Sequence, residues 1–166
     1  MILDLPLILE TRRNHALEHA TIHMLSAKYP DRHLAGHSNP TGFFVLGNVT
    51  TEDLKSAVTE AWTRLRAGES ELAIHAGCGT NFATTAFMAG TFAWFPLSGS
   101  KSMRRRLWLL PFAVAFGILG FVLSQPLGPV LQAKVTTEAD LGNLQIEDIL
   151  PVRKSGVAVH RVITRS

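Results

Sequence analysis

The chain has 166 residues, 46% of them hydrophobic and 17% charged, with a formal net charge of +3 and a mean hydropathy of +0.17. Soluble domains carry roughly 25% charged residues, so this composition favours a protein in contact with lipid. The length suits one modest domain with appendages rather than two independent cores. The densest basic cluster lies between two apolar runs, and basic and aromatic residues do not alternate, so we expect no nucleic-acid partner.

The first ten residues, MILDLPLILE, do not match a signal peptide. Asp4 stands where a signal peptide has a basic region, and no small-residue cleavage site follows the short apolar stretch. We expect this segment to be an amphipathic lead-in to a helix over Thr11–Lys28, which Pro30 ends.

Two short strands and a second helix are predicted next. Residues 33–49 contain the turn signal NPTG between two extended stretches. Thr50 and Asp53 resemble a capping box that starts the second helix, and Gly68 is expected to end it. The following ELAIH (71–75) is predicted to be a strand.

Two long uncharged runs predict a transmembrane hairpin. No residue from Ala76 to Ser100 or from Leu107 to Ala133 is charged, and each run exceeds the roughly 20 residues that a helix needs to cross about 30 Å of hydrocarbon. We expect spans at Asn81–Leu97 and Leu107–Leu127, with both termini on the same side of a bacterial cell membrane. A re-entrant form of the shorter run, or a buried helical pair in a soluble core, is the alternative.

The connector between the two runs, SGSKSMRRR (98–106), carries four basic residues. The positive-inside rule would place it in the cytoplasm and the head outside. The head would then have to cross the membrane without a signal peptide, so the side on which it lies stays open.

The C-terminal part is predicted to be extended. Leu131–Thr137, Leu144–Val152 and Val157–Thr164 read as strands, and Arg153-Lys154-Ser155-Gly156 reads as the turn that joins the last two. These strands are expected to pair with those of the N-terminal part.

The predicted fold class is therefore α+β. A small head at residues 1–80 is interrupted by a two-helix transmembrane hairpin at 81–131, and the segment 132–166 completes the sheet of the head. The lipid bilayer is the expected partner, with other membrane proteins as further candidates.

Three histidines recur at intervals of four in the phrase HALEHATIH (15–23). Residues four apart lie on one face of a helix, so His15 and His19 can hold one ion, as can His19 and His23. A single ion shared by all three is harder, because His15 and His23 are about 12 Å apart along the axis. Glu18 projects near the same side.

The first five residues of that phrase match H-x-x-E-H, the pattern of the inverzincin zinc hydrolases. In that resemblance His15 and His19 are zinc ligands, and Glu18 is the general base that takes a proton from the attacking water. An inverzincin has a further glutamate ligand several tens of residues downstream. No matching glutamate stands between Glu71 and Glu138, so other residues must complete the site.

His75 and Cys78, spaced H-x-x-C in a glycine-rich turn, are the candidates for the remaining ligands. Cys78 precedes a helix N-terminus, where the partial positive charge favours the thiolate. A site of His15, His19 and Cys78 leaves one position open for catalysis, whereas His75 as a fourth ligand would make the ion structural. Zn²⁺ is the expected cofactor, and His23 is a further candidate ligand.

The leading interpretation is a membrane-anchored metal-binding protein that acts as a zinc-dependent hydrolase, with a peptidase as the example. The histidines could instead form a polar helix face without a ligand, or Cys78 could be a nucleophile with a histidine as its base. A membrane-anchored metal- or haem-binding module, or an accessory subunit of a membrane complex, is the alternative without catalysis. No C-x-x-C-H occurs, which excludes covalent haem attachment.

Five phrases occur in an order that resembles a bacterial family of small, uncharacterised membrane proteins known by a domain-of-unknown-function label. HALEHATIH is the most specific part of the resemblance, which covers most of the chain. The resemblance implies two membrane helices and a histidine-rich head, and it carries no activity or ligand assignment. The phrases are RRNHALEHATIHML (12–25), TGFFVLGNV (41–49), HAGCGTN (75–81), SQPLG (124–128) and VTTEADLGNL (135–144).

Overall fold

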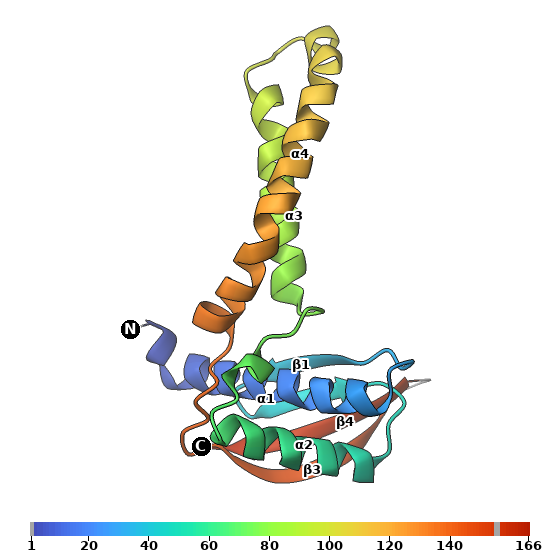
Figure 1. Ribbon diagram of the computed structural model, residues 1–166, viewed down its shortest axis with the longest axis vertical. Helices are drawn as coiled ribbons and strands as arrows, with labels where there is room; N and C mark the ends of the chain where they lie inside the picture. Colours follow the sequence, from blue (N-terminus) through green and yellow to red (C-terminus); the bar gives the residue numbers. More distant parts are fainter. Residues whose placement is uncertain (1, 155–156) are drawn as a thin grey trace. The chain divides into compact units, whose positions relative to one another are not determined.

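The computed structural model describes residues 2–154 and 157–166, and they form two compact units (Figure 1). The head unit comprises Met1–His75 and Ala133–Ser166, and the helical unit comprises Ala76–Gln132. The head unit combines helices with a four-stranded antiparallel sheet, which confirms the predicted α+β class. A turn was predicted at residues 153–156. Residues 155 and 156 of that turn lie outside the described residues.

The head unit is built from two long helices, four strands and short helical turns. The strand order is β1-β2-β4-β3, so the last strand in the sequence lies between the two hairpins and joins them. The elements are η1 (Ile2–Asp4), α1 (Pro6–Lys28), β1 (Ala35–Asn39), β2 (Gly42–Leu46), α2 (Thr51–Arg66), η2 (Ser70–Ala73), β3 (Gln145–Lys154) and β4 (Val157–Arg165).

The pairing of β4 with β2 explains why the two ends of the chain share one sheet. Phe43 pairs with Val162, and Val45 pairs with His160, and all four side chains are buried. Cross-strand partners lie on the same face of an antiparallel sheet, so these residues form the face that the helices cover. The prediction that the C-terminal strands complete the sheet of the head is confirmed.

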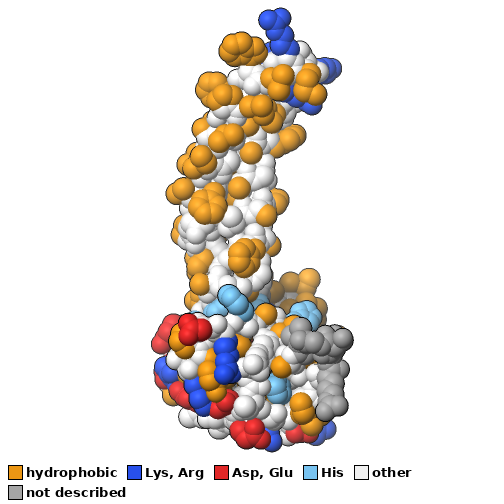
Figure 2. Space-filling view, turned by 90° about the vertical axis from the view of Figure 1, so that its right-hand side faces the viewer, with side chains coloured by type: hydrophobic (Ala, Val, Ile, Leu, Met, Phe, Trp, Pro, Cys, Tyr) orange, Lys and Arg blue, Asp and Glu red, His pale blue; other side chains and the backbone are white. Residues whose placement is uncertain are grey.

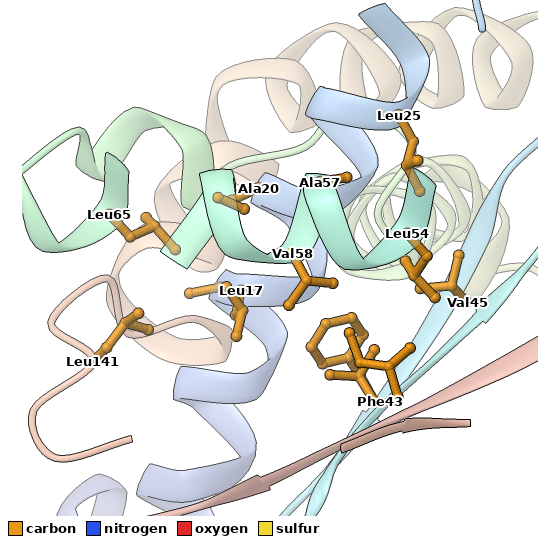
Figure 3. Packing of buried hydrophobic residues seen from close by; sticks show 14 of the residues in the cluster. Leu17, Ala20, Leu25, Phe43, Val45, Leu54, Ala57, Val58, Leu65 and Leu141 are labelled. Carbon is orange, nitrogen blue, oxygen red and sulfur yellow. The ribbon is translucent and has the colours of Figure 1, made fainter. Parts of the chain in front are cut away.

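The core lies between that face and the helices α1 and α2 (Figure 3). α1 and α2 each contribute aliphatic side chains from one face, as expected of amphipathic helices that cover a sheet. The residues labelled in the figure are Leu17, Ala20, Leu25, Phe43, Val45, Leu54, Ala57, Val58, Leu65 and Leu141.

Local signals set the ends of α2 as predicted. The Thr50 hydroxyl accepts a hydrogen bond from the Asp53 backbone N–H at 3.1 Å and donates to the Asp53 carboxylate at 2.8 Å. At the other end Gly68 has φ +97°, a left-handed conformation that favours glycine. α1 differs from its prediction, because it already begins at Pro6 rather than at Thr11.

Two segments predicted to be extended are helical. ELAIH contains the end of the 3₁₀ helix η2, and most of 131–137 is a π-helical turn, η3 (Gln132–Thr136). The strand prediction failed at 71–75 because the carbonyls of Ala73 and Ile74 accept hydrogen bonds from imidazoles of α1 instead of from a neighbouring strand. Alternation over five residues is too short to decide between these outcomes.

The helical unit consists of α3 (Gly79–Ser98) and α4 (Met103–Leu131), which pack along each other. Gly120 permits the close approach, since a Cβ added there would lie 2.6 Å from the Met88 carbonyl oxygen. α4 continues through Pro126, where the sequence had predicted its end.

Among the described residues, one helix is long and apolar enough, by length and composition, to cross a membrane. It is the continuous stretch Met103–Thr136, with a mean hydropathy of 2.2 over its best window. Two spans were predicted, and α3 does not meet this criterion, so composition supports one of them. Polar side chains lower the hydropathy of α3, and they are Thr80, Asn81, Thr84, Thr85, Thr91 and Ser98.

Most large apolar side chains of the helical unit are exposed. Figure 2 shows them in orange along this unit, with basic side chains in blue at one end. They come from both helices and from several faces of α4, and they include Phe82, Phe87, Trp94, Phe95, Trp108, Phe112, Val114, Ile118, Phe121 and Val122. An exposed apolar surface of this extent indicates contact with lipid or with other apolar helices.

Candidate metal centre

α1 carries His15, His19 and His23 along one side, as its four-residue spacing predicts. The His19 side chain is almost fully buried, with 1% exposed, and the other two are partly exposed. The ring centroids of His15 and His19 are 4.3 Å apart. The sequence therefore brings at least one imidazole pair together on this helix.

Backbone carbonyls fix the tautomers of these rings. His15 Nδ1 lies 2.9 Å from the Thr136 oxygen, and His19 Nδ1 lies 2.7 Å from the Ala73 oxygen. A carbonyl oxygen only accepts, so Nδ1 carries the hydrogen in both rings. In the neutral ring the lone pair is then on Nε2, which is the arrangement found in histidines that bind metals.

His23 and His75 extend the cluster beyond the first pair. His23 Nε2 lies 2.8 Å from the Ile74 oxygen, so its lone pair is on Nδ1. The adjacent carbonyls of Ala73 and Ile74 are thus both held by α1, which brings the next residue, His75, to the same side. The His75 ring centroid is 5.6 Å from that of His19 and 5.1 Å from that of His23.

Burial keeps His75 uncharged at neutral pH. Burial, together with the nearby His19 and His23, lowers the pKa of His75 from 6.5 to about 4. A neutral imidazole can donate a lone pair to a metal, whereas a protonated one cannot. The cluster is therefore in a form that can bind a cation without first releasing a proton from His75.

The ring separations suit metal ligands. Zinc binds an imidazole nitrogen at about 2.0–2.1 Å, which places the centroids of two rings on one tetrahedral ion about 5 Å apart. The three measured separations, from 4.3 to 5.6 Å, lie on both sides of that value.

The predicted catalytic residue Glu18 is buried, with 4% of its surface exposed. The Ser38 hydroxyl of β1 donates to its Oε2 at 2.5 Å. Gly36, also on β1, lies so close that a Cβ added there would be 2.1 Å from Oε1. Neither Ser38 nor Gly36 was predicted, because the pairing of a helix residue with a particular strand is not encoded in a local pattern.

The first half of α1 is tied to the segment that follows the helical unit. Arg12 donates to the Thr137 oxygen at 2.9 Å and forms an ion pair with Glu138 at 3.3 Å. Arg13 donates to the Asp140 oxygen at 3.0 Å. Together with the bond from His15 to Thr136, these contacts hold the N-terminal end of the histidine face in place.

Cys78 is the N-cap residue of α3, as predicted, and belongs to the helical unit. Its sulfur accepts a hydrogen bond from the Thr80 backbone N–H at 3.5 Å. By donor type, His15, His19 and Cys78 could together bind a metal ion. His160, which was expected to be a strand residue, is buried in β4 and bonds to the Thr51 hydroxyl at 3.1 Å.

Comparison with known proteins places the chain in a family. Residues 10–149 match the family described as a domain of unknown function, DUF6391. The chain belongs to this family. The resemblance to an uncharacterised family is thereby confirmed, and its matched region includes the histidine helix and both helices of the helical unit.

A relative within the curated proteins supports the same assignment. The chain is 37% identical over 155 residues to the uncharacterized protein SYNPCC7002_A1392 of Picosynechococcus sp., covering 86% of this chain and 72% of that protein. No solved structure matches the chain. The chemistry of this family member is therefore argued from its own side chains.

Proposed function

We propose that this protein is a membrane-anchored zinc protein whose head unit binds the ion through His15 and His19 and uses it for hydrolysis. The observation that carries the proposal is the pair of Nδ1–H bonds to the Thr136 and Ala73 carbonyls, which give both rings the tautomer found in histidines that bind metals through Nε2. Two ordinary surface histidines do not need a hydrogen bond from each ring to a backbone carbonyl.

Cys78 is the third ligand of the proposed site. It follows His75 by three residues, and three residues of chain span at most about 10 Å. His75 itself lies against His19, so the length of the chain allows the sulfur to reach the imidazole pair. Two nitrogens and one thiolate with an open fourth position are a ligand set of catalytic zinc.

Glu18 is the proposed general base. It is adjacent to His19 in sequence, and the Ser38 hydroxyl limits the orientations of its carboxylate. Zinc, when bound, supplies a Lewis acid that makes water easier to deprotonate. Glu18 then accepts a proton from water, the water oxygen bonds to the substrate carbonyl carbon, and the proton passes to the leaving group as its bond breaks.

The helical unit is the proposed membrane anchor, and both helices cross. β4 is paired with β2, so the residues before and after the helical unit belong to one sheet and lie on one side of a membrane. The chain between them must cross an even number of times. If α4 crosses, α3 must cross as well.

Three of the polar side chains that lower the hydropathy of α3 have partners inside the helical unit. Thr85 bonds to Ser124 at 2.9 Å, and Asn81 accepts from Gln132 at 2.7 Å. Thr84 bonds to a backbone carbonyl of its own helix. Polar groups satisfied in this way are tolerated in membrane helices, which supports two spans in spite of the composition of α3.

Zinc binding is tested with the purified full-length protein in detergent. In His15→Asn/His19→Asn the amide nitrogen can replace each Nδ1–H donor, but the Nε2 ligand is lost. We expect zinc per chain, measured by elemental analysis, to fall by about one ion while the far-ultraviolet circular dichroism is unchanged. His37→Asn, at an exposed histidine of β1, is the matched control. Unchanged zinc in the double variant would overturn the proposal.

Catalysis is tested with Glu18→Gln and a mixture of internally quenched peptides as substrate. Loss of a general base slows hydrolysis by about 10²–10⁴-fold, while zinc content should stay that of the unaltered protein. Peptide hydrolysis that is equal in both proteins would remove Glu18 from the mechanism. A protein that holds zinc and cleaves no peptide would be the non-catalytic metal module.

The two crossings are tested by labelling lysines in oriented vesicles with an amine reagent that does not cross membranes. Lys55 lies on the head and Lys101 in the connector, and both side chains are exposed. We expect mass spectrometry to find them modified from opposite faces. Modification of both from one face would show that the helical unit does not cross.

A further inference from the structure

The four imidazoles of the cluster, those of His15, His19, His23 and His75, are too widely spread for one ion. His15 and His23 are eight residues apart on α1, which is about 12 Å along the helix axis. Two nitrogens on one zinc are about 3.3 Å apart when each bond is about 2.0 Å, so these two rings cannot share an ion. Any cation held by His23 therefore lies apart from a cation held by His15 and His19.

We propose that His23 and His75 form a second position for a divalent first-row metal ion, about one helical turn along α1 from His15 and His19. The proposal extends the zinc function proposed above. Its ligands are different residues, so either position can fail without the other.

The two rings are already held near each other. Their centroids are 5.1 Å apart and their planes are inclined by 79°, so they approach edge to face without stacking. The hydrogen bond from His23 Nε2 to the Ile74 carbonyl leaves the lone pair of His23 on Nδ1. Because His75 directly follows Ile74, the same contact that orients one ring also fixes the backbone of the other.

The position is partly open to solvent, as an exchangeable metal site requires. Both side chains are only half-buried, in contrast to the almost fully buried His19. Two imidazoles leave further positions on the ion for water or for a third imidazole, and His19 lies 5.6 Å from His75. His19 therefore adjoins both positions.

The donor chemistry differs between the two positions. The second position offers only imidazole nitrogens, which suit copper, nickel and zinc, and among divalent ions copper binds nitrogen sites most tightly. The first position, with its proposed thiolate, favours zinc. We therefore expect the His23–His75 position to bind Zn²⁺ more weakly than the first one does.

Equilibrium dialysis of the full-length protein in detergent against Zn²⁺ tests this inference. The unaltered protein should bind about two ions per chain, and His23→Gln/His75→Gln should bind about one. The glutamine amide at position 23 can still donate to the Ile74 carbonyl. His33→Gln/His37→Gln, at two exposed histidines of the head, is the matched control and should bind about two.

The combination of variants separates the two proposals. His15→Asn/His19→Asn should keep about one ion, lost only when His23 and His75 are also replaced. Two ions in His23→Gln/His75→Gln, or a single ion in the unaltered protein that this double variant keeps, would overturn the second position and leave the first intact. Two ions in His15→Asn/His19→Asn would instead overturn the first. Trp62 fluorescence, which reports on the head unit, must be unchanged in each variant.

Discussion

The two long helices α1 and α4 differ in where their large apolar side chains lie. In α1 Leu17, Ile22 and Leu25 are buried, along with polar side chains such as those of Glu18 and His19. In α4 the buried residues are small or polar, namely Ala113, Gly120, Ser124 and Gly128, while its large apolar side chains are exposed. The head unit is therefore organised for water, and the helical unit for an apolar surrounding.

The charged side chains are also distributed unequally between the head unit and the helical unit. Residues 76–132 contain no aspartate, glutamate or histidine, and their only basic side chains are those of the connector and the residues beside it. Every candidate metal ligand except Cys78 lies in the head unit. If the proposed anchor is correct, metal and protons should act on the head unit and lipid on the helical unit.

The largest expected effect on stability is that of removing a large side chain from the interior of the head unit. Phe43 is fully buried, and Phe43→Ala should lower the free energy of unfolding by about 3–5 kcal/mol, because it leaves a cavity. Phe112, 60% exposed on α4, should change it by less than about 0.5 kcal/mol when replaced by alanine. Equal effects of the two changes would contradict the contrast between the units.

Urea unfolding in detergent can report on the head unit alone. Trp62 is the only tryptophan of the head unit and donates to the Leu144 oxygen at 3.0 Å, while Trp94 and Trp108 lie in the helical unit. In a Trp94→Phe/Trp108→Phe background the fluorescence change therefore follows the head. Both replaced side chains are exposed, so the background should retain the stability of the head.

The second effect is that of metal removal. A ligand at 100 times its dissociation constant stabilises the folded state by about 2.7 kcal/mol. Chelation of zinc should thus lower the urea midpoint of the Trp62 signal and leave the Trp94 and Trp108 signals of the helical unit unchanged. His15→Asn/His19→Asn should remove most of the difference between chelated and zinc-loaded protein, because the proposed His23–His75 position binds Zn²⁺ more weakly. A chelator effect of undiminished size in this variant would place the stabilising ion elsewhere.

Regular patterns in the sequence predicted much of this fold. The capping pair Thr50 and Asp53, the glycine at 68 and the turn at 39–42 are local signals, and each gave the expected boundary. The pairing of C-terminal strands with β2 could be inferred because isolated strands need partners. The four-residue spacing of histidines likewise predicted that they share one side of a helix.

Contacts between distant backbone groups could not be predicted. The carbonyls of Ala73, Ile74 and Thr136 orient three imidazoles, yet any residue type supplies a carbonyl, so no sequence pattern marks them. The same contacts turned the predicted strand at 71–75 into a helical turn. The hydropathy of α3 was overestimated because uncharged threonines were counted as compatible with a full span.

The third effect is the loss of stability of the metal-free head unit in acid. The pKa of His75 is lowered from 6.5 to about 4, mainly by burial. The unfolded chain therefore binds a proton near pH 6.5 that the folded chain binds only near pH 4. The stabilising contribution is present above pH 6.5 and is lost as the pH falls towards 4.

Because His75 is only half-buried, we expect a loss of about 1–2 kcal/mol, less than the full shift would give. His75→Gln should flatten the dependence of the urea midpoint between pH 7 and 5. Burial also lowers the pKa of His160. The urea midpoint of His75→Gln should therefore keep a smaller dependence on pH in the same direction. The helical unit, which lacks acidic residues and histidines, should show no slope; an equal slope in both units would contradict the assignment to His75.

The smallest effect is expected inside the helical unit, where polar side chains join the two helices. The hydroxyls of Thr85 and Ser124 are 2.9 Å apart, and such bonds in membrane proteins contribute about 0.6 kcal/mol on average and at most about 1.7. A double-mutant cycle of Thr85→Val and Ser124→Ala, followed by Trp94 and Trp108 fluorescence in Trp62→Phe, measures the coupling. Ser98→Ala, whose hydroxyl bonds only within α3, is the control. Zero coupling would mean that close packing at Gly120, rather than hydrogen bonding, holds the two helices together, and the polar residues of α3 would then no longer support a second span.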